Sequence, residues 1–121
     1  MRLAVVGSRY FSDYQWLQYC LLSHFRLEDI EAIISGGAHG ADALAERFAR
    51  EYGIPLRVFP ADWARHGRRA GPLRNTEIVR NADAVAAFWD GSSSGTRDTV
   101  TKARTAGLYV AEFPLVPLES S

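Results

Sequence analysis

The chain lacks several features that mark common protein classes. It has one cysteine, Cys20, so no disulfide can form within it, and this cysteine falls in an apolar helical pattern typical of a buried thiol. No apolar run approaches the length of a membrane span, and no signal-peptide pattern opens the sequence. The three histidines have no metal-ligand spacing to one another or to Cys20. We therefore expect a cytoplasmic, soluble protein with no metal, no resident cofactor and no membrane partner.

An excess of charge of either sign is also missing. Fourteen basic and fourteen acidic residues give a formal net charge of zero, so no overall basic field indicates nucleic acid as a partner. All basic residues but Lys102 are arginine, which suits anion binding through two-pronged contacts but equally reflects base composition in a genome. A length of 121 residues with 47% apolar and 23% charged residues predicts one globular domain with a sizeable core.

Short apolar segments alternate with helical patterns along the chain. The expected strands are 2–6, 31–35, 54–59, 84–88 and 108–113. The expected helices are 14–25, capped by Ser12 or Asp13, then 41–52, one starting near Pro72 after a long polar connection, and 96–106. This alternation predicts an α/β fold whose parallel sheet is covered on both faces. With right-handed crossovers we expect a Rossmann-like, doubly wound, five-stranded sheet of order 3-2-1-4-5, as a single domain over residues 1–113 with a loose tail over 114–121.

The most informative stretch runs from Ser35 to Asp42, where a buried strand passes through a G-G-x-x-G loop into a helix. Glycine lets the backbone approach a ligand closely, and the first N–H groups of a helix have no partner within it. The loop therefore predicts a phosphate cradle at Gly36, Gly37 and Gly40. It matches neither the dinucleotide fingerprint nor the Walker A loop, and the alternative is a tight strand-to-helix turn whose glycines serve packing alone.

Three other loops reach the same edge of the predicted sheet. In doubly wound sheets ligands bind beyond the carboxyl ends of the strands, near the point where the strand order reverses. Those ends carry residues 7–9, 35–37, 61–63 and 90–91. A Ser-rich loop then leads to Gly95 and Thr96, which form a second candidate cradle; Thr96 would cap the next helix or bond a phosphate oxygen, and a mobile loop is the alternative.

The polar connection supplies further candidates. Asp62 lies about 20 residues beyond the glycine loop, comparable to the acid that holds ribose hydroxyls in dinucleotide-binding folds. Trp63 would stack on a base or simply cover the core. Arg74 and Asn75, at the start of a helix, are expected to point into the crevice. Residues 60–80 are locally basic, as either a solvated connection or a flap that clamps anions.

Taken together, these motifs resemble a known family. They are Gly7-Ser8-Arg9, residues 35–42, Ala61-Asp62-Trp63, residues 70–75, and residues 88–91 with Gly95-Thr96. In this order they resemble the small YspA-like branch of the SLOG superfamily, over nearly the whole chain. The superfamily also holds the LONELY GUY phosphoribohydrolases, which cut the base from a nucleoside monophosphate, and the DNA-processing protein A family, which binds single-stranded DNA. The resemblance implies a Rossmann-like sheet, a nucleotide or nucleotide-derived ligand, and often a homodimer.

One departure from the family pattern bears on catalysis. The phosphoribohydrolases carry P-G-G-x-G-T-x-x-E with a catalytic glutamate, and Thr99 stands in its place here, whereas Arg74 matches their arginine. Threonine cannot act as a carboxylate in acid–base chemistry or beside an oxocarbenium-like centre. Asp98, one residue earlier, would point about 100° away around the helix. Asp62 or Asp90 would have to substitute.

The predicted function is therefore binding of a nucleotide or nucleotide-derived ligand, as a sensor, carrier or sequestering module. The alternative is a nucleotide N-glycosidase, with Arg74 and an acid from Asp62, Asp90 or Asp98 as catalytic residues. Single-stranded nucleic-acid binding is a third interpretation, which the neutral charge disfavours. The expected ligand-binding residues are Gly7, Ser8, Arg9, Ser35, Gly36, Gly37, Ala38, Gly40, Asp42, Asp62, Trp63, Arg74, Asn75, Asp90, Gly91, Gly95 and Thr96.

Overall fold

The computed structural model describes residues 1–117 and contains one five-stranded sheet, in the order β3-β2-β1-β4-β5. Every neighbouring pair of strands is parallel. The predicted α/β, doubly wound fold and its strand order are confirmed. The strands are β1 (Arg2–Gly7), β2 (Ala32–Ser35), β3 (Leu56–Val58), β4 (Ala84–Phe88) and β5 (Tyr109–Phe113).

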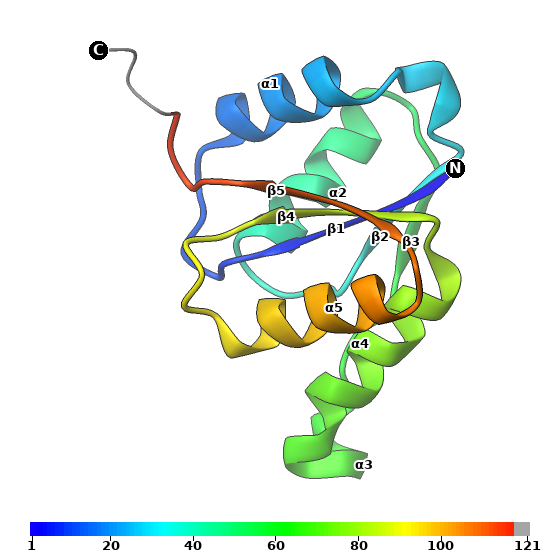
Figure 1. Ribbon diagram of the computed structural model, residues 1–121, viewed down its shortest axis with the longest axis vertical. Helices are drawn as coiled ribbons and strands as arrows, with labels where there is room; N and C mark the ends of the chain where they lie inside the picture. The colour runs from blue at the N-terminus through cyan, green and yellow to red at the C-terminus, as the bar shows by residue number, and fades with distance from the viewer. Residues whose placement is uncertain (118–121) are drawn as a thin grey trace.

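Helices cover both faces of this sheet (Figure 1). The elements outside the sheet are α1 (Tyr14–His24), η1 (Leu27–Asp29), α2 (Ala41–Glu51), α3 (Trp63–His66), η2 (Gly67–Arg69), α4 (Ala70–Asn81) and α5 (Ser94–Thr105). Helices α1 and α2 pack on one face, where Leu17 and Phe48 are fully buried. Helices α4 and α5 pack on the other, through Ile78 and Val100. The result is three layers, with α3 projecting from one end of the molecule (Figure 1).

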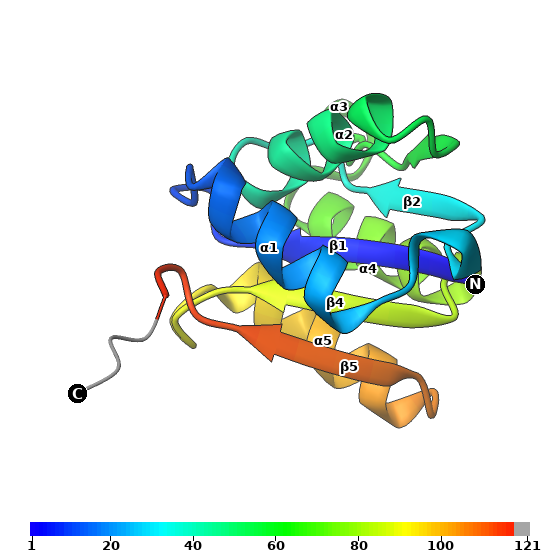
Figure 2. The same ribbon diagram turned by 90° about the horizontal axis from the view of Figure 1, so that it is seen from above.

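Alternation along β1 explains why it lies at the centre. Leu3 and Val5 join the core beneath α1 and α2, whereas Ala4 and Val6 join the core beneath α4 and α5. Both faces of a central parallel strand must be apolar, because helices cover each of them. The outer strands β3 and β5 are partly exposed, in contrast to the buried strands expected from sequence, because each pairs on one edge only. Figure 2 shows β1 and β4 side by side, with β2 and β5 outside them.

Several boundaries differ from the sequence-based expectations. The polar connection after β3 holds α3 and η2, neither of which was predicted, and α4 begins at Ala70 rather than near Pro72. Pro72 fits the first helical turn because its missing N–H would have no partner there. Helix α5 begins two residues before Thr96, and Ser93 caps it by accepting the Thr96 N–H at 3.2 Å. The predicted capping role of Thr96 is therefore wrong, whereas Asp13 caps α1 as expected.

The start of the predicted C-terminal tail is attached to the domain. The indole Nε1 of Trp16, on α1, donates to the Pro114 carbonyl at 2.8 Å. Residues 118–121 of the predicted tail lie outside the described residues. Cys20 is buried against the core beneath α1, as predicted. Within residues 1–117, the helices are too short and too polar for any of them to cross a lipid bilayer.

Candidate functional site

A cleft of about 710 Å³ opens at the carboxyl ends of the strands. The loop after β1, the start of α4, and the loop that leads from β4 into α5 form its walls. Strands β1 and β4 are neighbours although they are far apart in sequence, and here the strand order reverses. Ligands of open α/β sheets bind at this point, and the volume lies within the usual range for small-molecule sites. The cleft is therefore the candidate functional site of this fold.

The N-terminus of α5 forms one wall of the cleft. Ser94 and Gly95 begin the helix, and their N–H groups have no carbonyl partner inside it. Both residues line the cleft, and a Cβ atom added to Gly95 would meet nothing within 4 Å. A helix N-terminus carries partial positive charge and free donors, which together favour an anion.

Arg74 forms the opposite wall. Its Nη1 donates to the Gly36 carbonyl at 2.6 Å, and its Nε donates to Asn75 Oδ1 at 2.9 Å. Burial is the main cause that lowers the pKa of Arg74, and the nearby charge of Arg9 adds to it, while Asp42 opposes both. An arginine nevertheless stays charged at neutral pH. Arg74 thus brings a fixed positive charge to the cleft.

Two further guanidinium groups, those of Arg9 and Arg68, line the cleft. Across residues 1–117, no carboxylate oxygen lies within the 4.0 Å ion-pair limit of Arg9, Arg68 or Arg74. Arginine forks match carboxylates and phosphates, so a cleft with three unmatched guanidinium groups suits an anionic ligand.

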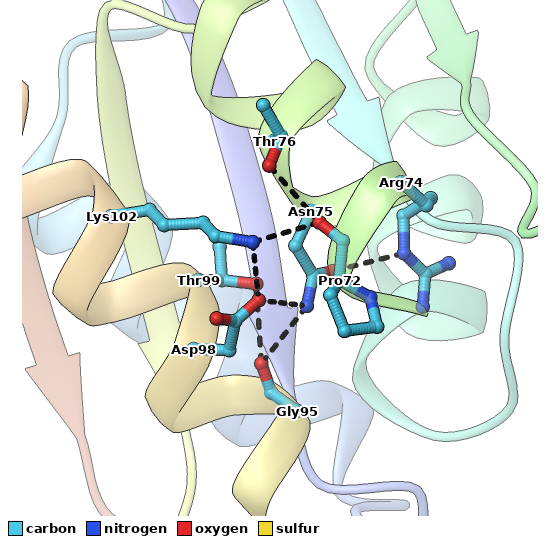
Figure 3. A network of polar contacts seen from close by, with 8 residues as sticks. All are labelled: Pro72, Arg74, Asn75, Thr76, Gly95, Asp98, Thr99 and Lys102. Atoms are coloured by element: carbon cyan, nitrogen blue, oxygen red, sulfur yellow. Dashed lines mark hydrogen bonds and ion pairs between the residues drawn. The ribbon is translucent and has the colours of Figure 1, made fainter. Parts of the chain in front are cut away.

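Asn75 connects the Arg74 wall to the α5 wall (Figure 3). Its Nδ2 donates to the Gly95 carbonyl at 3.3 Å and to Asp98 Oδ2 at 3.1 Å. Lys102 Nζ binds the same Asp98 oxygen at 2.9 Å and the Pro72 carbonyl at 2.8 Å. The donor and acceptor ends of the Asn75 amide cannot be exchanged, because Arg74 can only donate and the Gly95 carbonyl can only accept. The two walls are thus joined by the buried side chain of Asn75 and, nearer the surface, by Lys102.

The glycine loop before α2 is occupied by the protein's own groups. Asp42 Oδ2 accepts the Ala38 N–H at 3.1 Å, and Ser35 Oγ accepts the Gly37 N–H at 3.1 Å. Gly40 has a left-handed φ of 75°, and a Cβ there would lie 2.2 Å from the Ser8 carbonyl oxygen. These contacts match the alternative of a tight turn whose glycines serve packing.

Asp42 is the one carboxyl group of this loop that borders the cleft. It is only 8% exposed, and burial is the main cause that raises its pKa. The Ala38 N–H and the Arg74 charge act in the opposite direction, and Glu46 reinforces the rise. Ser35 Oγ donates to Glu46 Oε2 at 2.8 Å, so the loop and α2 share one buried polar cluster. Asp42 therefore holds a proton more tightly than an ordinary aspartate does.

The structure brings eleven of the seventeen predicted ligand residues to the cleft. They are Gly7, Ser8, Arg9, Ala38, Asp42, Trp63, Arg74, Asn75, Asp90, Gly95 and Thr96. The other six do not line it: Ser35, Gly36, Gly37, Gly40, Asp62 and Gly91. Asp62 instead caps α3, where its Oδ1 accepts the Arg65 N–H at 3.1 Å.

Comparison with known proteins agrees with the resemblance found in the sequence. Residues 1–66 match the model of the YspA, cpYpsA-related SLOG family. The chain belongs to this family. It is also similar to the Gene 61 protein of Mycobacterium phage D29, with 35% identity over 119 residues, covering 93% of this chain and 95% of the phage protein.

Several residues that line the cleft of this SLOG protein were not predicted from the sequence as ligand residues. Tyr10, Arg68, Asp98 and residues 92–94 border it without belonging to the predicted set. Arg68 was visible only as part of a basic segment. Asp98 was expected to point away from the place of the family's glutamate, yet it lines the cleft together with Thr99. The signal available for Tyr10 was its position directly after the Gly7-Ser8-Arg9 motif.

The acidic groups of the SLOG cleft differ in their environment. Asp90 accepts from the Ser92 hydroxyl and N–H, and these bonds lower its pKa, so it stays ionised. Asp98 is tied to Asn75 and Lys102. Thr99 donates its hydroxyl to the Gly95 carbonyl at 3.3 Å and offers no carboxylate. Across residues 1–117, no three His, Cys, Asp or Glu side chains gather closely enough to hold a metal ion.

Proposed function

We propose that the cleft binds a nucleotide or nucleotide-derived ligand. The observation that carries this proposal is the position of Arg74, half-buried and without a carboxylate partner among residues 1–117, across the cleft from the N-terminus of α5. A phosphate between them would accept from the Ser94 and Gly95 amides and from the guanidinium group. Membership of the SLOG family and the position at the strand-order reversal support the same assignment.

The phosphate position differs from the one that the sequence suggested first. The glycine loop before α2 directs its Gly37 and Ala38 amides at Ser35 and Asp42, so those amides are already satisfied. Ser94 and Gly95, which carry the first amides of α5, line the cleft instead. The proposed role of the α2 loop is to place Asp42 and Arg74, and the α5 amides would hold the phosphate.

The first experiment is mass spectrometry of small molecules released by denaturing the purified protein, together with a thermal-shift panel of nucleotides. A retained nucleotide, or one that raises the melting temperature, supports the proposal. Arg74→Ala should then weaken binding by about tenfold or more, because a charged hydrogen bond contributes about 1.5–3 kcal/mol. Arg80→Ala is the matched control on the same helix, since Arg80 pairs with Glu77 on the surface. If no nucleotide is retained and none raises the melting temperature, the proposal is contradicted.

A second candidate function is hydrolysis of the bond between base and ribose. Asp42 favours it, because a buried carboxyl group with a raised pKa beside Arg74 suits general acid–base catalysis. Release of free base from a bound nucleoside monophosphate would support hydrolysis. Asp42→Asn should then abolish release while the nucleotide still binds. Binding without any release of base leaves the protein as a binding module.

A further inference from the structure

Tyr10 is an aromatic side chain that the fold presents to the cleft instead of burying. It is 93% exposed and lines the cleft. Its backbone is held on both sides: the Tyr10 N–H donates to Ser8 Oγ at 3.1 Å, and the Phe11 N–H donates to the Ser8 carbonyl at 3.3 Å. Phe11 is buried and stacks on Phe88 at 5.1 Å. An anchored loop thus holds the Tyr10 ring in solvent, where it forgoes about 1.5–3 kcal/mol of burial.

Trp63 is a second exposed aromatic side chain on the lining of the same cleft. It is 52% exposed, and it begins α3. One edge of its indole rests against α4, because a Cβ on Gly71 would lie 3.3 Å from Trp63 Cη2. The ring is therefore supported on one side and available on the other.

The two rings come from separate parts of the sheet edge. Tyr10 follows β1 and Trp63 follows β3, and β2 lies between these strands. Two strand spacings amount to about 10 Å, so the segments that carry the rings are well separated. Among residues 1–117, the aromatic pairs in contact do not include Tyr10 with Trp63. Each ring is thus free to stack with a partner of its own.

Positive charge accompanies the rings on the cleft lining. Arg9 is the neighbour of Tyr10 in sequence. Arg68 lies in η2, directly after the helix that Trp63 begins. Arg74, on α4, forms the wall opposite the N-terminus of α5. A mononucleotide has one base and would use one ring. Two aromatic rings with cationic groups around them match two bases joined through an anionic linker.

We propose that the ligand of this cleft is a dinucleotide, with one base stacked on Trp63, the other on Tyr10, and the phosphate linker bound by the arginines. This inference rests on the proposed nucleotide site and specifies the ligand class. Stacking of a base on an aromatic side chain contributes about 1–3 kcal/mol, so the second ring adds substantial affinity. The linker is either a phosphodiester or a pyrophosphate, since both present anionic oxygens to arginine.

The test is isothermal titration of the whole chain with four adenine probes. These are AMP, the phosphodiester-linked dinucleotide ApA, the pyrophosphate-linked dinucleotide AppA, and the pentanucleotide of adenosine. At least one dinucleotide should bind about tenfold more tightly than AMP, because the second base stacks. Whichever of ApA and AppA binds more tightly identifies the linker. The pentanucleotide should gain nothing over ApA.

Two single substitutions and one control assign the rings. Tyr10→Ala and Trp63→Ala should each weaken the dinucleotide by about fivefold or more. Only one of them should weaken AMP, because AMP occupies one ring. Tyr19→Ala, an exposed aromatic on α1 outside the cleft lining, should change neither affinity.

Three results would overturn the dinucleotide assignment while leaving the nucleotide site intact. The first is AMP binding as tightly as both dinucleotides. The second is loss of AMP affinity in both variants, which would place one base between the two rings. The third is affinity that rises from ApA to the pentanucleotide, which would indicate an oligonucleotide ligand. If none of the four probes binds and the wider nucleotide panel gives no thermal shift, the proposed function itself fails.

Discussion

Asp42 and Arg74 both place the ends of their side chains beside Gly36, without forming an ion pair with each other. A Cβ atom on Gly36 would lie 2.9 Å from Asp42 Oδ2 and 2.5 Å from Arg74 Nη1, so a larger residue there would displace both side chains. Each affects the titration of the other, since the Arg74 charge lowers the pKa of Asp42 and the Asp42 charge raises the pKa of Arg74. This pair lets a buried carboxyl group and a half-buried guanidinium group share one wall of the cleft.

The first prediction concerns the pH dependence of stability. Burial raises the pKa of Asp42 above its ordinary value of 3.8, so the folded state holds this proton more tightly than the unfolded chain does. The stability that Asp42 contributes is therefore greatest at low pH, and it falls as the pH rises from about 3.8 through the raised pKa. Asp42→Asn should remove that fall. Urea denaturation at several pH values between about 3.5 and 7 measures the unfolding free energy of wild type and Asp42→Asn.

Asp83 provides a control of opposite sign. Its bonds to Arg2 lower the pKa of Asp83, so its stabilising effect is present above 3.8 and is lost as the pH falls through the lowered pKa. The difference in unfolding free energy between wild type and Asp83→Asn should therefore become smaller as the pH falls. Parallel pH profiles for wild type and Asp42→Asn would contradict the burial of an ionisable carboxyl group at position 42.

The second prediction concerns the amide of Asn75. Asn75→Asp would place a carboxylate oxygen where Nδ2 now donates to the Gly95 carbonyl and to Asp98. The unfolding free energy should fall by about 1–3 kcal/mol, and part of it should return near pH 4 as the new carboxyl group is protonated. The measurement is chemical denaturation at pH 7 and pH 4.

The same substitution on the same helix supplies the control. Within residues 1–117, the Asn81 side chain donates only to the Glu77 carbonyl, at 2.8 Å on the exposed side of α4. Asn81→Asp should cost less than Asn75→Asp at pH 7. Equal losses would show that Asn75 does not hold the two walls together.

The third prediction separates stability from binding at Gly95. Gly95→Ala replaces a helical glycine whose Cβ position is empty, so the unfolding free energy should rise, by up to about 0.5–1 kcal/mol. The added methyl group would border the proposed phosphate, so nucleotide affinity should fall. Thermal melts and titration of the tightest nucleotide test both statements.

Gly107, at the other end of α5, is the matched control. Its left-handed φ of 79° makes Gly107→Ala destabilising, by about 1 kcal/mol, without an effect on affinity. If Gly95→Ala is stabilised and its nucleotide affinity is undiminished, the phosphate does not bind at the first amides of α5.

The fourth prediction concerns the single thiol. Burial raises the pKa of Cys20 to about 11, so little thiolate exists at pH 8 and the side chain is covered. A disulfide reagent such as Ellman's should react slowly with the native protein and fast in urea. Native labelling as fast as labelling in urea would contradict the buried position of Cys20.

Long apolar patterns made most of the fold predictable. Residues 84–88 are buried throughout and form β4 with the predicted bounds, because a strand covered on both faces must be apolar at every position. The α3–η2 segment was missed because its helices are too short and polar to show a periodic apolar face. Local capping also decided boundaries, since any of three consecutive serines before Gly95 can cap a helix and only the fold selects Ser93.

The site was predictable as a set of loops but not as a set of contacts. Parallel strands bring their carboxyl ends to one edge, so the positions of Arg9, Arg74 and Asp90 followed from topology. The direction of each loop amide did not follow. Only side-chain geometry shows that Asp42 accepts the Ala38 N–H in the loop that the glycines suggested for phosphate.

The Ser8 carbonyl has a mechanical consequence for the cleft. It accepts the N–H of Phe11 at 3.3 Å and of Ala41 at 3.1 Å, while Gly40 packs directly against it. The loop after β1 and the first turn of α2 are therefore tied to each other through this one carbonyl group. Selection of a ligand by its shape should therefore depend most on this wall of the cleft.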